Sequence, residues 1–388
     1  MAMSSEKKDL ELQFWKKNKT MNEGKTRNNL YFNQLDGLRS LAVLSVMVCH
    51  WITLKAVILI PLGSMGVNLF FVLSGFLITR ILLIDKDTNG TRSILIPIKK
   101  FYIRRTLRIF PVYYLVCLIL LSINFHASRE NAWWLLSYLF NIKFALPGVW
   151  ESGQLSYMVH LWSLSVEEQF YLIFPILIFL IPKKNIKAFL ILTIIIGVAS
   201  RLGIYLLSWP KNSIYVLTPA CFDALGIGAL LAYYFMFEKN RLQSILNKNY
   251  ILYFVFFLFV SSIIYSRNFI KGYGECRTIT ERFLFSICCF WIVGKAVMNE
   301  YRGGVKLFLE NKIVLFIGKI SYGLYIYHYF AEPFYDFLNI KPLLNIISNK
   351  YFYHFVKVSL YFIMTLTIST LSYYIIEKPI NNFKSKFK

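Results

Sequence analysis

The chain has 388 residues, of which 57% are hydrophobic, 18% aromatic and only 16% charged, and its mean hydropathy is +0.52. This composition excludes an ordinary soluble globular protein, in which about a quarter of the residues carry charge. Lys and Arg number 43 against 20 Asp and Glu. In a membrane protein such an excess gathers in cytoplasmic loops, so we expect no nucleic-acid partner. A basic face can still attract an anionic ligand.

Apolar stretches of about 20 residues, the length that crosses a lipid bilayer, recur through the chain. We expect an all-α polytopic membrane protein, multi-pass in the inner or plasma membrane, with about ten transmembrane helices. The expected spans are 35–54, 63–84, 109–125, 160–181, 187–208, 214–237, 250–266, 279–298, 313–333 and 353–376. The apolar segment 132–147 is short and contains Asn141 and Lys143, so we expect a re-entrant or interfacial segment there.

The distribution of basic residues predicts the orientation. The tail before the first span and the loop 85–108 are rich in Lys and Arg, whereas the loop after the first span has only Lys55. Because basic loops stay on the cytoplasmic side, we expect both termini in the cytoplasm. The expected regions are a flexible cytoplasmic tail over 1–33, a transmembrane domain over 34–380 and a basic cytoplasmic tail over 381–388.

The first expected span reads LDGLRSLAVLSVMVCHW (35–51) and contains Asp36, Arg39 and His50. Helical geometry makes Arg39 and His50 point nearly the same way, about 16 Å apart along the axis. Ionisable groups inside a span usually face a protein interior or a water-filled cavity and mark function. The alternatives are a buried Asp36–Arg39 ion pair and an interfacial His50 that only ends the helix.

Two segments place small or basic residues between the middle of the membrane and its cytoplasmic side. GSMGVNLFFVLSGFLITR (63–80) places Ser74 and Gly75 near mid-membrane and Arg80 toward the cytoplasm, although helix packing alone could explain its small residues. KKFYIRRTLRIFP (99–111) places Arg105 and Arg108 one turn apart, and guanidinium groups suit phosphates. Its alternative is an ordinary basic flank.

Two further segments place histidines toward the outer side. If helical, HLWSLSVEEQFYLIFP (160–175) presents His160 and Glu167 on one side, and a carboxylate at that depth needs a partner or water. GKISYGLYIYHYFAEP (318–333) presents Tyr325 and His328 together, or else forms an aromatic interfacial belt. The six cysteines show no metal-type spacing, and there is no Gly-rich phosphate loop. We therefore expect no metal and no tightly bound cofactor.

Taken together, these motifs resemble the acyltransferase family 3 membrane proteins over about residues 33–380. The resemblance is carried by LDGLRSLAVLSVMVCH with its Arg-x10-His spacing, GVNLFFVLSGFLITR, RRTLRIFPVYY, HLWSLSVEEQFYLIFP and ISYGLYIYH, in the family's order. It implies an acyl-CoA donor, used as a substrate from the cytoplasm. It also implies transfer of the acyl group, usually acetyl, to a hydroxyl of an extracytoplasmic sugar, such as a surface polysaccharide, O-antigen, lipopolysaccharide or glycolipid.

The resemblance also implies roles for individual residues. The implied catalytic residues are His50, Glu167 and Arg39. The implied acyl-CoA-binding residues are Arg105, Arg108, Ser74, Gly75 and Arg80. The implied acceptor-binding residues are His160, His328 and Asp36. Some family members carry an additional C-terminal hydrolase-like domain, whereas this chain resembles the stand-alone form, which leaves open a separate extracytoplasmic transfer partner.

A second hypothesis comes from the ionisable residues alone. Intramembrane Arg, His and Glu would equally serve a proton-coupled transporter of a small anion or lipid-linked intermediate, without covalent chemistry. The absence of recognisable internal repeats disfavours that alternative.

Overall fold

A computed structural model of the protein describes residues 31–52, 60–89, 94–150, 152–269, 275–344 and 347–383. Within these residues all regular secondary structure is helical. Gln34 to Lys388 make one compact unit, and the fold below is that of this unit. The two expected cytoplasmic tails lie mostly outside the described residues.

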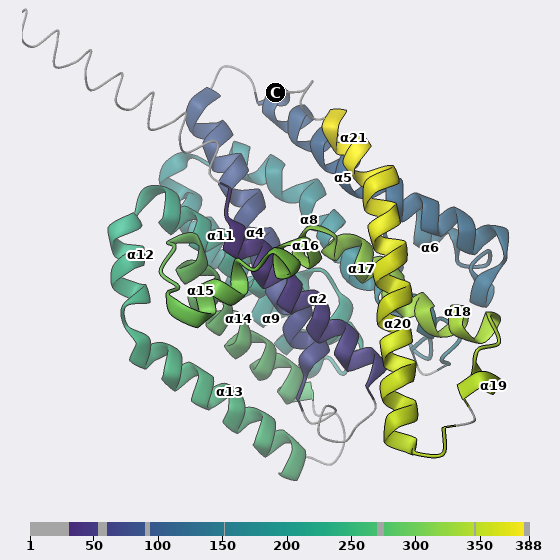
Figure 1. Ribbon diagram of the computed structural model, residues 1–388. Coiled ribbons are helices and arrows are strands. Elements are labelled where there is room, and N and C mark those ends of the chain that lie inside the picture. Colours follow the sequence, from purple (N-terminus) through teal and green to yellow (C-terminus); the bar gives the residue numbers. More distant parts are fainter. Residues whose placement is uncertain are drawn as a thin grey trace, which may run out of the picture. The chain divides into compact units, whose positions relative to one another are not determined.

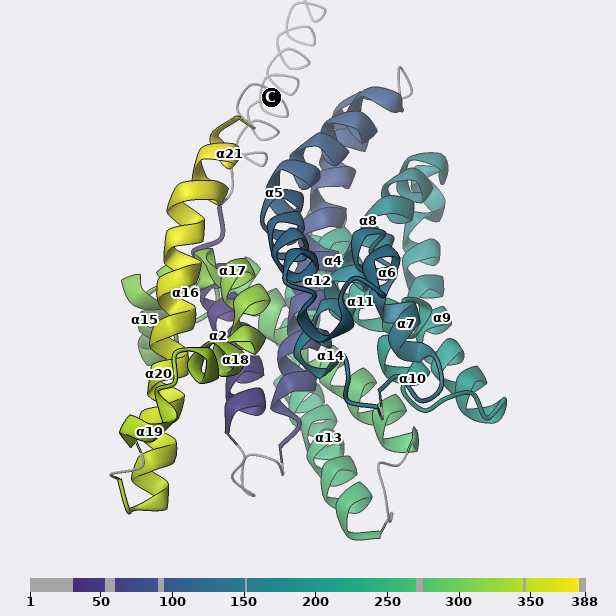
Figure 2. The same ribbon diagram turned by 90° about the vertical axis from the view of Figure 1, so that its right-hand side faces the viewer.

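Most of the fold consists of long helices (Figures 1 and 2). They are α2 (Asn33–Trp51), α4 (Leu62–Asn89), α5 (Leu95–Ser122), α8 (Leu161–Leu180), α9 (Ile186–Leu206), α11 (Phe222–Phe237), α13 (Asn249–Phe269), α14 (Glu275–Val297) and α20 (Lys350–Ser372). Helix α20 continues through the π-helical turn η6 (Tyr373–Glu377) into α21 (Lys378–Asn382). Shorter helices are α6 (Ala132–Leu136), α7 (Phe140–Ala145), α10 (Ser213–Val216), α12 (Lys239–Leu246), α15 (Gly303–Leu309), α16 (Lys312–Lys319), α17 (Ser321–Tyr327), α18 (Ala331–Phe337) and α19 (Lys341–Leu344). Single turns of 3-10 helix are η1 (Phe125–Ala127), η2 (Ser156–Met158), η3 (Lys183–Asn185), η4 (Pro219–Cys221) and η5 (His328–Phe330).

In the described part of the chain, 7 helical segments are long and apolar enough to cross a membrane. They are Leu62–Thr88, Leu95–Ser122, Leu161–Leu180, Lys183–Leu206, Pro219–Phe237, Asn249–Ser266 and Lys350–Asn382. The prediction of an all-helical polytopic membrane protein is thereby confirmed. The expected spans 35–54, 279–298 and 313–333 do not reach that standard, so the count of about ten and the cytoplasmic termini stay predictions.

The expectation of one straight helix over 313–333 is wrong. The chain breaks after Lys319 between α16 and α17, and it tightens into η5 before α18. At the first break Gly318 touches helix α2, where an added Cβ would lie 2.0 Å from the carbonyl oxygen of Asp36. At the second, Pro333 has no N–H with which to continue a regular helix from η5. The breaks change where Tyr325 and His328 point relative to a straight helix.

The segment 132–147 forms the short helices α6 and α7, neither of which can cross a membrane. Its polar Asn141 is fully buried and donates from Nδ2 to the Thr218 hydroxyl at 3.0 Å and to the Val216 carbonyl at 3.2 Å. Protein partners rather than lipid therefore satisfy this side chain. Whether the segment is re-entrant or interfacial stays a prediction.

Helices α4 and α11 form the centre of the unit. They are 72% and 78% buried along their apolar stretches, whereas α13 and α20 are only 17% and 22% buried. Glycines on each helix allow this close packing: an added Cβ at Gly75 would lie 2.0 Å from the Leu225 carbonyl oxygen, and one at Gly228 would lie 2.0 Å from that of Val72. Since α4 and α11 lock together in this way, α4 is a fixed wall for the cavities beside it.

Buried charges near this centre are paired. Arg201 of α9 and Asp223 of α11 form two hydrogen bonds, of 2.8 and 2.7 Å, between side chains that are 0% and 1% exposed. The Lys86 ammonium donates to the carbonyls of Ile178 and Phe179 at 2.6 and 3.0 Å, at the end of α8. A cation there complements the negative end of the helix dipole, so Lys86 fixes the end of α8 against α4.

Candidate active site

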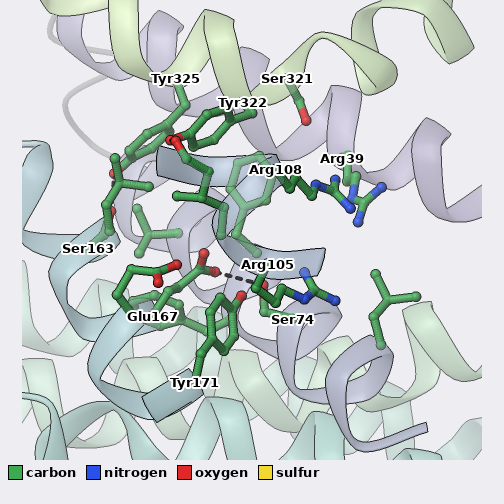
Figure 3. A pocket seen from close by; sticks show the side chains of 17 residues that line it. Arg39, Ser74, Arg105, Arg108, Ser163, Glu167, Tyr171, Ser321, Tyr322 and Tyr325 are labelled. Atoms are coloured by element: carbon green, nitrogen blue, oxygen red, sulfur yellow. Dashed lines mark hydrogen bonds between the residues drawn. The ribbon is translucent and has the colours of Figure 1, made fainter. Parts of the chain in front are cut away.

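Two cavities are lined by residues of the motifs that the sequence singles out. The first, which we call the arginine cavity, encloses about 800 Å³ of empty space including its mouth and is bounded by α2, α4, α5, α8 and α17 (Figure 3). The polar residues that line it are Arg39, Ser74, Arg105, Arg108, Ser163, Glu167, Glu168, Tyr171, Ser321, Tyr322 and Tyr325. Five separate sequence motifs therefore meet in one cavity.

The three arginines lie on one side of this cavity (Figure 3). Arg39 Nη1 lies 2.9 Å from Asp36 Oδ1, so one positive charge is paired. Arg105 lies over the rings of Phe101 and Tyr171, with 5.8 and 5.4 Å from its guanidinium carbon to the ring centres. Neither Arg105 nor Arg108 makes a hydrogen bond or an ion pair with any other described residue. Their N–H groups remain available to an anion.

Glu167 and the hydroxyl groups of Ser163 and Tyr325 lie across the cavity from the arginines (Figure 3). The Ser74 hydroxyl donates to Glu167 Oε1 at 2.7 Å, which joins α4 to α8. One turn further along α8, Tyr171 lines the same cavity, as expected for residues four apart. Glu168 also lines the cavity, and its buried Oε1 has no hydrogen-bond partner in the described part of the chain. The cavity thus combines a basic wall with an acidic wall.

The second cavity, which we call the histidine cavity, is larger and encloses about 2270 Å³ of empty space including its mouth. Its polar and aromatic lining includes His50, Ser64, Asn68, Trp150, His160, Trp162, Lys211, Asn212, Tyr215, Phe259, Glu281, Arg282, Phe285, Tyr325 and Tyr329. Aromatic faces beside amide and charged groups can hold a polar ring that also has apolar faces, as sugars do. The two cavities share the lining residues Val67 and Tyr325.

The hydrogen bonds of the histidines determine which nitrogens carry hydrogen. His328 Nδ1 lies 2.6 Å from the Tyr325 carbonyl oxygen, and because a carbonyl only accepts, this nitrogen must donate. In a neutral imidazole the other nitrogen is then an acceptor. His50 Nδ1 lies 2.9 Å from His328 Nε2, so His50 is the donor in that contact. The lone pair of His50 therefore sits on Nε2, which has no partner among the described residues while His50 lines the cavity.

His160 is held beside this pair. Its ring stacks on Tyr329 at 4.8 Å between ring centres, and its Nε2 lies 3.0 Å from the Ile326 carbonyl oxygen. Nε2 is consequently the protonated nitrogen, and the buried Nδ1 has no hydrogen-bond partner within the described residues. The Trp51 indole also donates to the His328 carbonyl at 3.1 Å. Residues from α2, from η5 and from the position just before α8 thus form one histidine cluster: His50, His160 and His328.

The same motifs fall within a region that matches a known protein family. The family model described as "Acyltransferase domain" matches residues 32–374. The chain belongs to this acyltransferase family. It is 30% identical to the peptidoglycan O-acetyltransferase OatA of Listeria monocytogenes, over 92% of this chain and 57% of that protein. It is 28% identical to the O-acetyltransferase OatA of Staphylococcus aureus strain NCTC 8325, over 92% of this chain and 58% of that protein.

A further relative, a putative O-acetyltransferase of Staphylococcus aureus strain COL, is 29% identical over 93% of this chain and 59% of that protein. The chain therefore spans less than two thirds of the length of each of these relatives. No solved structure matches the chain.

The acyltransferase residues that the sequence singled out fall into three groups. Arg39, Ser74, Arg105, Arg108 and Glu167 line the arginine cavity. His50, His160 and His328 form the histidine cluster, so His50 and Glu167 line different cavities. The remaining three line neither cavity: Asp36 is buried and paired with Arg39, Gly75 packs against α11, and Arg80 is buried.

Two residues that matter in this geometry were not selected from the sequence as site residues. Tyr325 lines both cavities, and its spacing of three residues from His328 was the available signal. Arg282 is only 3% exposed, lines the histidine cavity and donates to the Tyr215 carbonyl at 3.0 Å. An arginine inside the expected span 279–298 was the signal for this residue.

Proposed function

We propose that this chain transfers an acyl group, in the first instance acetyl, from cytoplasmic acyl-CoA to a hydroxyl of an extracytoplasmic cell-surface glycan. The observation that carries the proposal is the pair of neighbouring cavities, which have the lining residues Val67 and Tyr325 in common. One presents two arginines without hydrogen-bond partners in the described part of the chain, and the other presents the lone pair of His50 Nε2. The arginines would bind the anionic head of the donor, and His50 would lie near its reactive end.

The fit of the donor rests on Arg105 and Arg108. Planar guanidinium groups bind phosphate oxygens through paired, charge-assisted hydrogen bonds. With Arg39 nearby on α2, three guanidinium groups face one cavity, and only Arg39 forms an ion pair, with Asp36. The phosphates of coenzyme A would give Arg105 and Arg108 direct hydrogen-bonding partners.

Charge also supports the orientation. In Figure 2 the C-terminal end of α4, the N-terminal end of α5 and helix α21 lie at the same end of the unit, opposite α19. That end carries the basic side chains Lys86, Lys99, Lys100, Arg104 and Lys378. Because basic residues favour the cytoplasmic side, we infer that this end is cytoplasmic. The phosphates would then enter from the cytoplasm.

The transfer step uses the free nitrogen of His50. The acceptor hydroxyl oxygen attacks the thioester carbonyl carbon, a C–O bond forms, and the C–S bond breaks. The hydroxyl proton passes to His50 Nε2 and from there to the leaving thiolate sulfur, which completes free coenzyme A. General base catalysis of this kind contributes about 10²–10⁴-fold in rate. Ser74 and Glu167 would position the thioester from the facing wall.

The acceptor would occupy the histidine cavity. Trp150, Trp162 and Tyr215 offer faces on which a sugar ring can stack, and Asn212 lines the same space. The Listeria relative is named for peptidoglycan, which supports a cell-wall glycan as the acceptor rather than a lipopolysaccharide. A separate extracytoplasmic partner that receives the acyl group first would use the same cavity.

Thiol release tests this proposal and separates it from a transporter. Purified protein with acetyl-CoA and a glycan fragment should release coenzyme A thiol together with an acetylated glycan. His50→Ala should abolish release while acetyl-CoA still binds. The double variant Arg105→Ala with Arg108→Ala should raise the KM for acetyl-CoA at least 100-fold, since each charge-assisted contact is worth about 1.5–3 kcal/mol.

Arg104→Ala is the matched control, because Arg104 lies on the same helix but does not line the arginine cavity. Membership of the acyltransferase family supports the enzyme over the carrier. Anion flux through vesicles with no thiol release from any of several glycans would contradict the enzyme.

A further inference from the structure

The arginine cavity and the histidine cavity meet at two lining residues that they have in common. Val67 of α4 and Tyr325 of α17 are the lining residues that both cavities share, and we call this pair the neck. Both side chains are almost buried, at 7% and 6% exposure. Phe70, which lines the arginine cavity, meets the Tyr325 ring edge-on at 6.0 Å between ring centres. Three bulky side chains therefore surround the junction.

Hydrogen bonds hold the neck in place. The Tyr325 hydroxyl lies 2.6 Å from the Ser163 hydroxyl, and it also donates to the His160 carbonyl at 3.2 Å. On the other side, α4 is locked against α11 by its glycine contacts. A ring fixed at its hydroxyl and a valine on an immobile helix cannot move apart easily, so the width of the neck is set by side-chain size.

From these walls we infer that Val67 and Tyr325 determine which acyl group the protein transfers, and that they restrict it to acetyl. The inference rests on the proposed function. The thioester carbon must be reached by a donor bound in the arginine cavity and by a hydroxyl activated at His50 in the histidine cavity. The reacting carbon therefore lies at the neck, and any further methylene groups of the acyl chain must fit there too.

The expected preference for acetyl-CoA over longer acyl-CoA donors follows from the packing of apolar groups. One additional or missing methylene in a close-fitting apolar site changes kcat/KM by about 10–200-fold. Propionyl-CoA carries one methylene more than acetyl-CoA and should be disfavoured by about this factor. The rest of the donor is identical, so binding to Arg105 and Arg108 does not distinguish the two.

The experiment compares Val67→Ala with Val72→Ala. Both changes remove the same two methyl groups from the same helix, but Val72 is 0% exposed and lines neither cavity. Thiol release with acetyl-CoA and propionyl-CoA gives the ratio of the two kcat/KM values. Val67→Ala should raise the propionyl-to-acetyl ratio at least tenfold, while Val72→Ala should keep the ratio of the unmodified protein.

Further variants keep the test decisive. Tyr325→Phe preserves the ring and should preserve the ratio, even where the rate falls. Val67→Ile adds a methyl group and should lower the ratio, so it replaces Val67→Ala if that variant fails to fold. A ratio that stays constant in the Val67 variants while they still transfer acetyl would overturn the inference. A failure of the unmodified protein to transfer acetyl to any glycan would instead overturn the proposed function, and the inference with it.

Discussion

His328 acts on His50 without facing the donor itself. It is fully buried, donates to the Tyr325 carbonyl and accepts from His50 Nδ1, so it fixes both the ring orientation and the tautomer of His50. In this account His328 is a positioning residue. The sequence predicted that His50 and His328 matter, but it could not predict their contact, because 278 positions separate them along the chain.

Replacing His328 tests this role. His328→Ala should lower kcat about 100-fold, within the range of general base catalysis, while the KM for acetyl-CoA stays unchanged. His328→Gln can still accept from His50 through its side-chain oxygen and donate to the Tyr325 carbonyl, so it should recover part of the rate. His354→Ala, outside both cavities, is the matched control. A fall in kcat together with a rise in KM, with no recovery in the glutamine variant, would mean that His328 only supports the fold.

Among the elements, α4 connects the fold to the site most directly. Gly75 was assigned to the acyl-CoA passage from the sequence, yet it points at α11, while Ser74 beside it lines the arginine cavity. Helical periodicity predicts which residues share a side, but it does not reveal which neighbour each side will meet. The same holds for α16 to α18, where contact with α2 interrupts the helix that the apolar pattern of 313–333 suggested.

Gly75→Ala should therefore destabilise the protein. The added Cβ would lie 2.0 Å from the Leu225 carbonyl oxygen, and backbone atoms cannot yield as a flexible side chain can. Overpacking of this kind costs about 1–3 kcal/mol. Gly203→Ala is the control, because an added Cβ there meets no atom within 4 Å. Thermal unfolding in detergent should show a lower midpoint for Gly75→Ala alone; an unchanged midpoint would show that α4 and α11 can separate at no cost.

For the molecule as a whole, the sequence predicted the class, while the number of spans and the roles of the site residues stay predictions. Apolar length and charge identify a multi-pass membrane protein, and most of the residues selected from the motifs line one of two cavities. Sequence could not show that His50 and Glu167 line different cavities, nor that Val67 and Tyr325 line both. Those facts depend on tertiary packing of helices distant in the chain.

The central proposal is that the donor binds from one side of the membrane and the acceptor from the other. An assay in sealed vesicles tests this directly. Protein reconstituted with its basic end inward receives acetyl-CoA only in the lumen and a glycan fragment only outside. We expect acetyl ester on the outer glycan, thiol in the lumen, and neither product with His50→Ala. Acetylation that requires both substrates on the same side of the membrane, or that persists in His50→Ala, would contradict it.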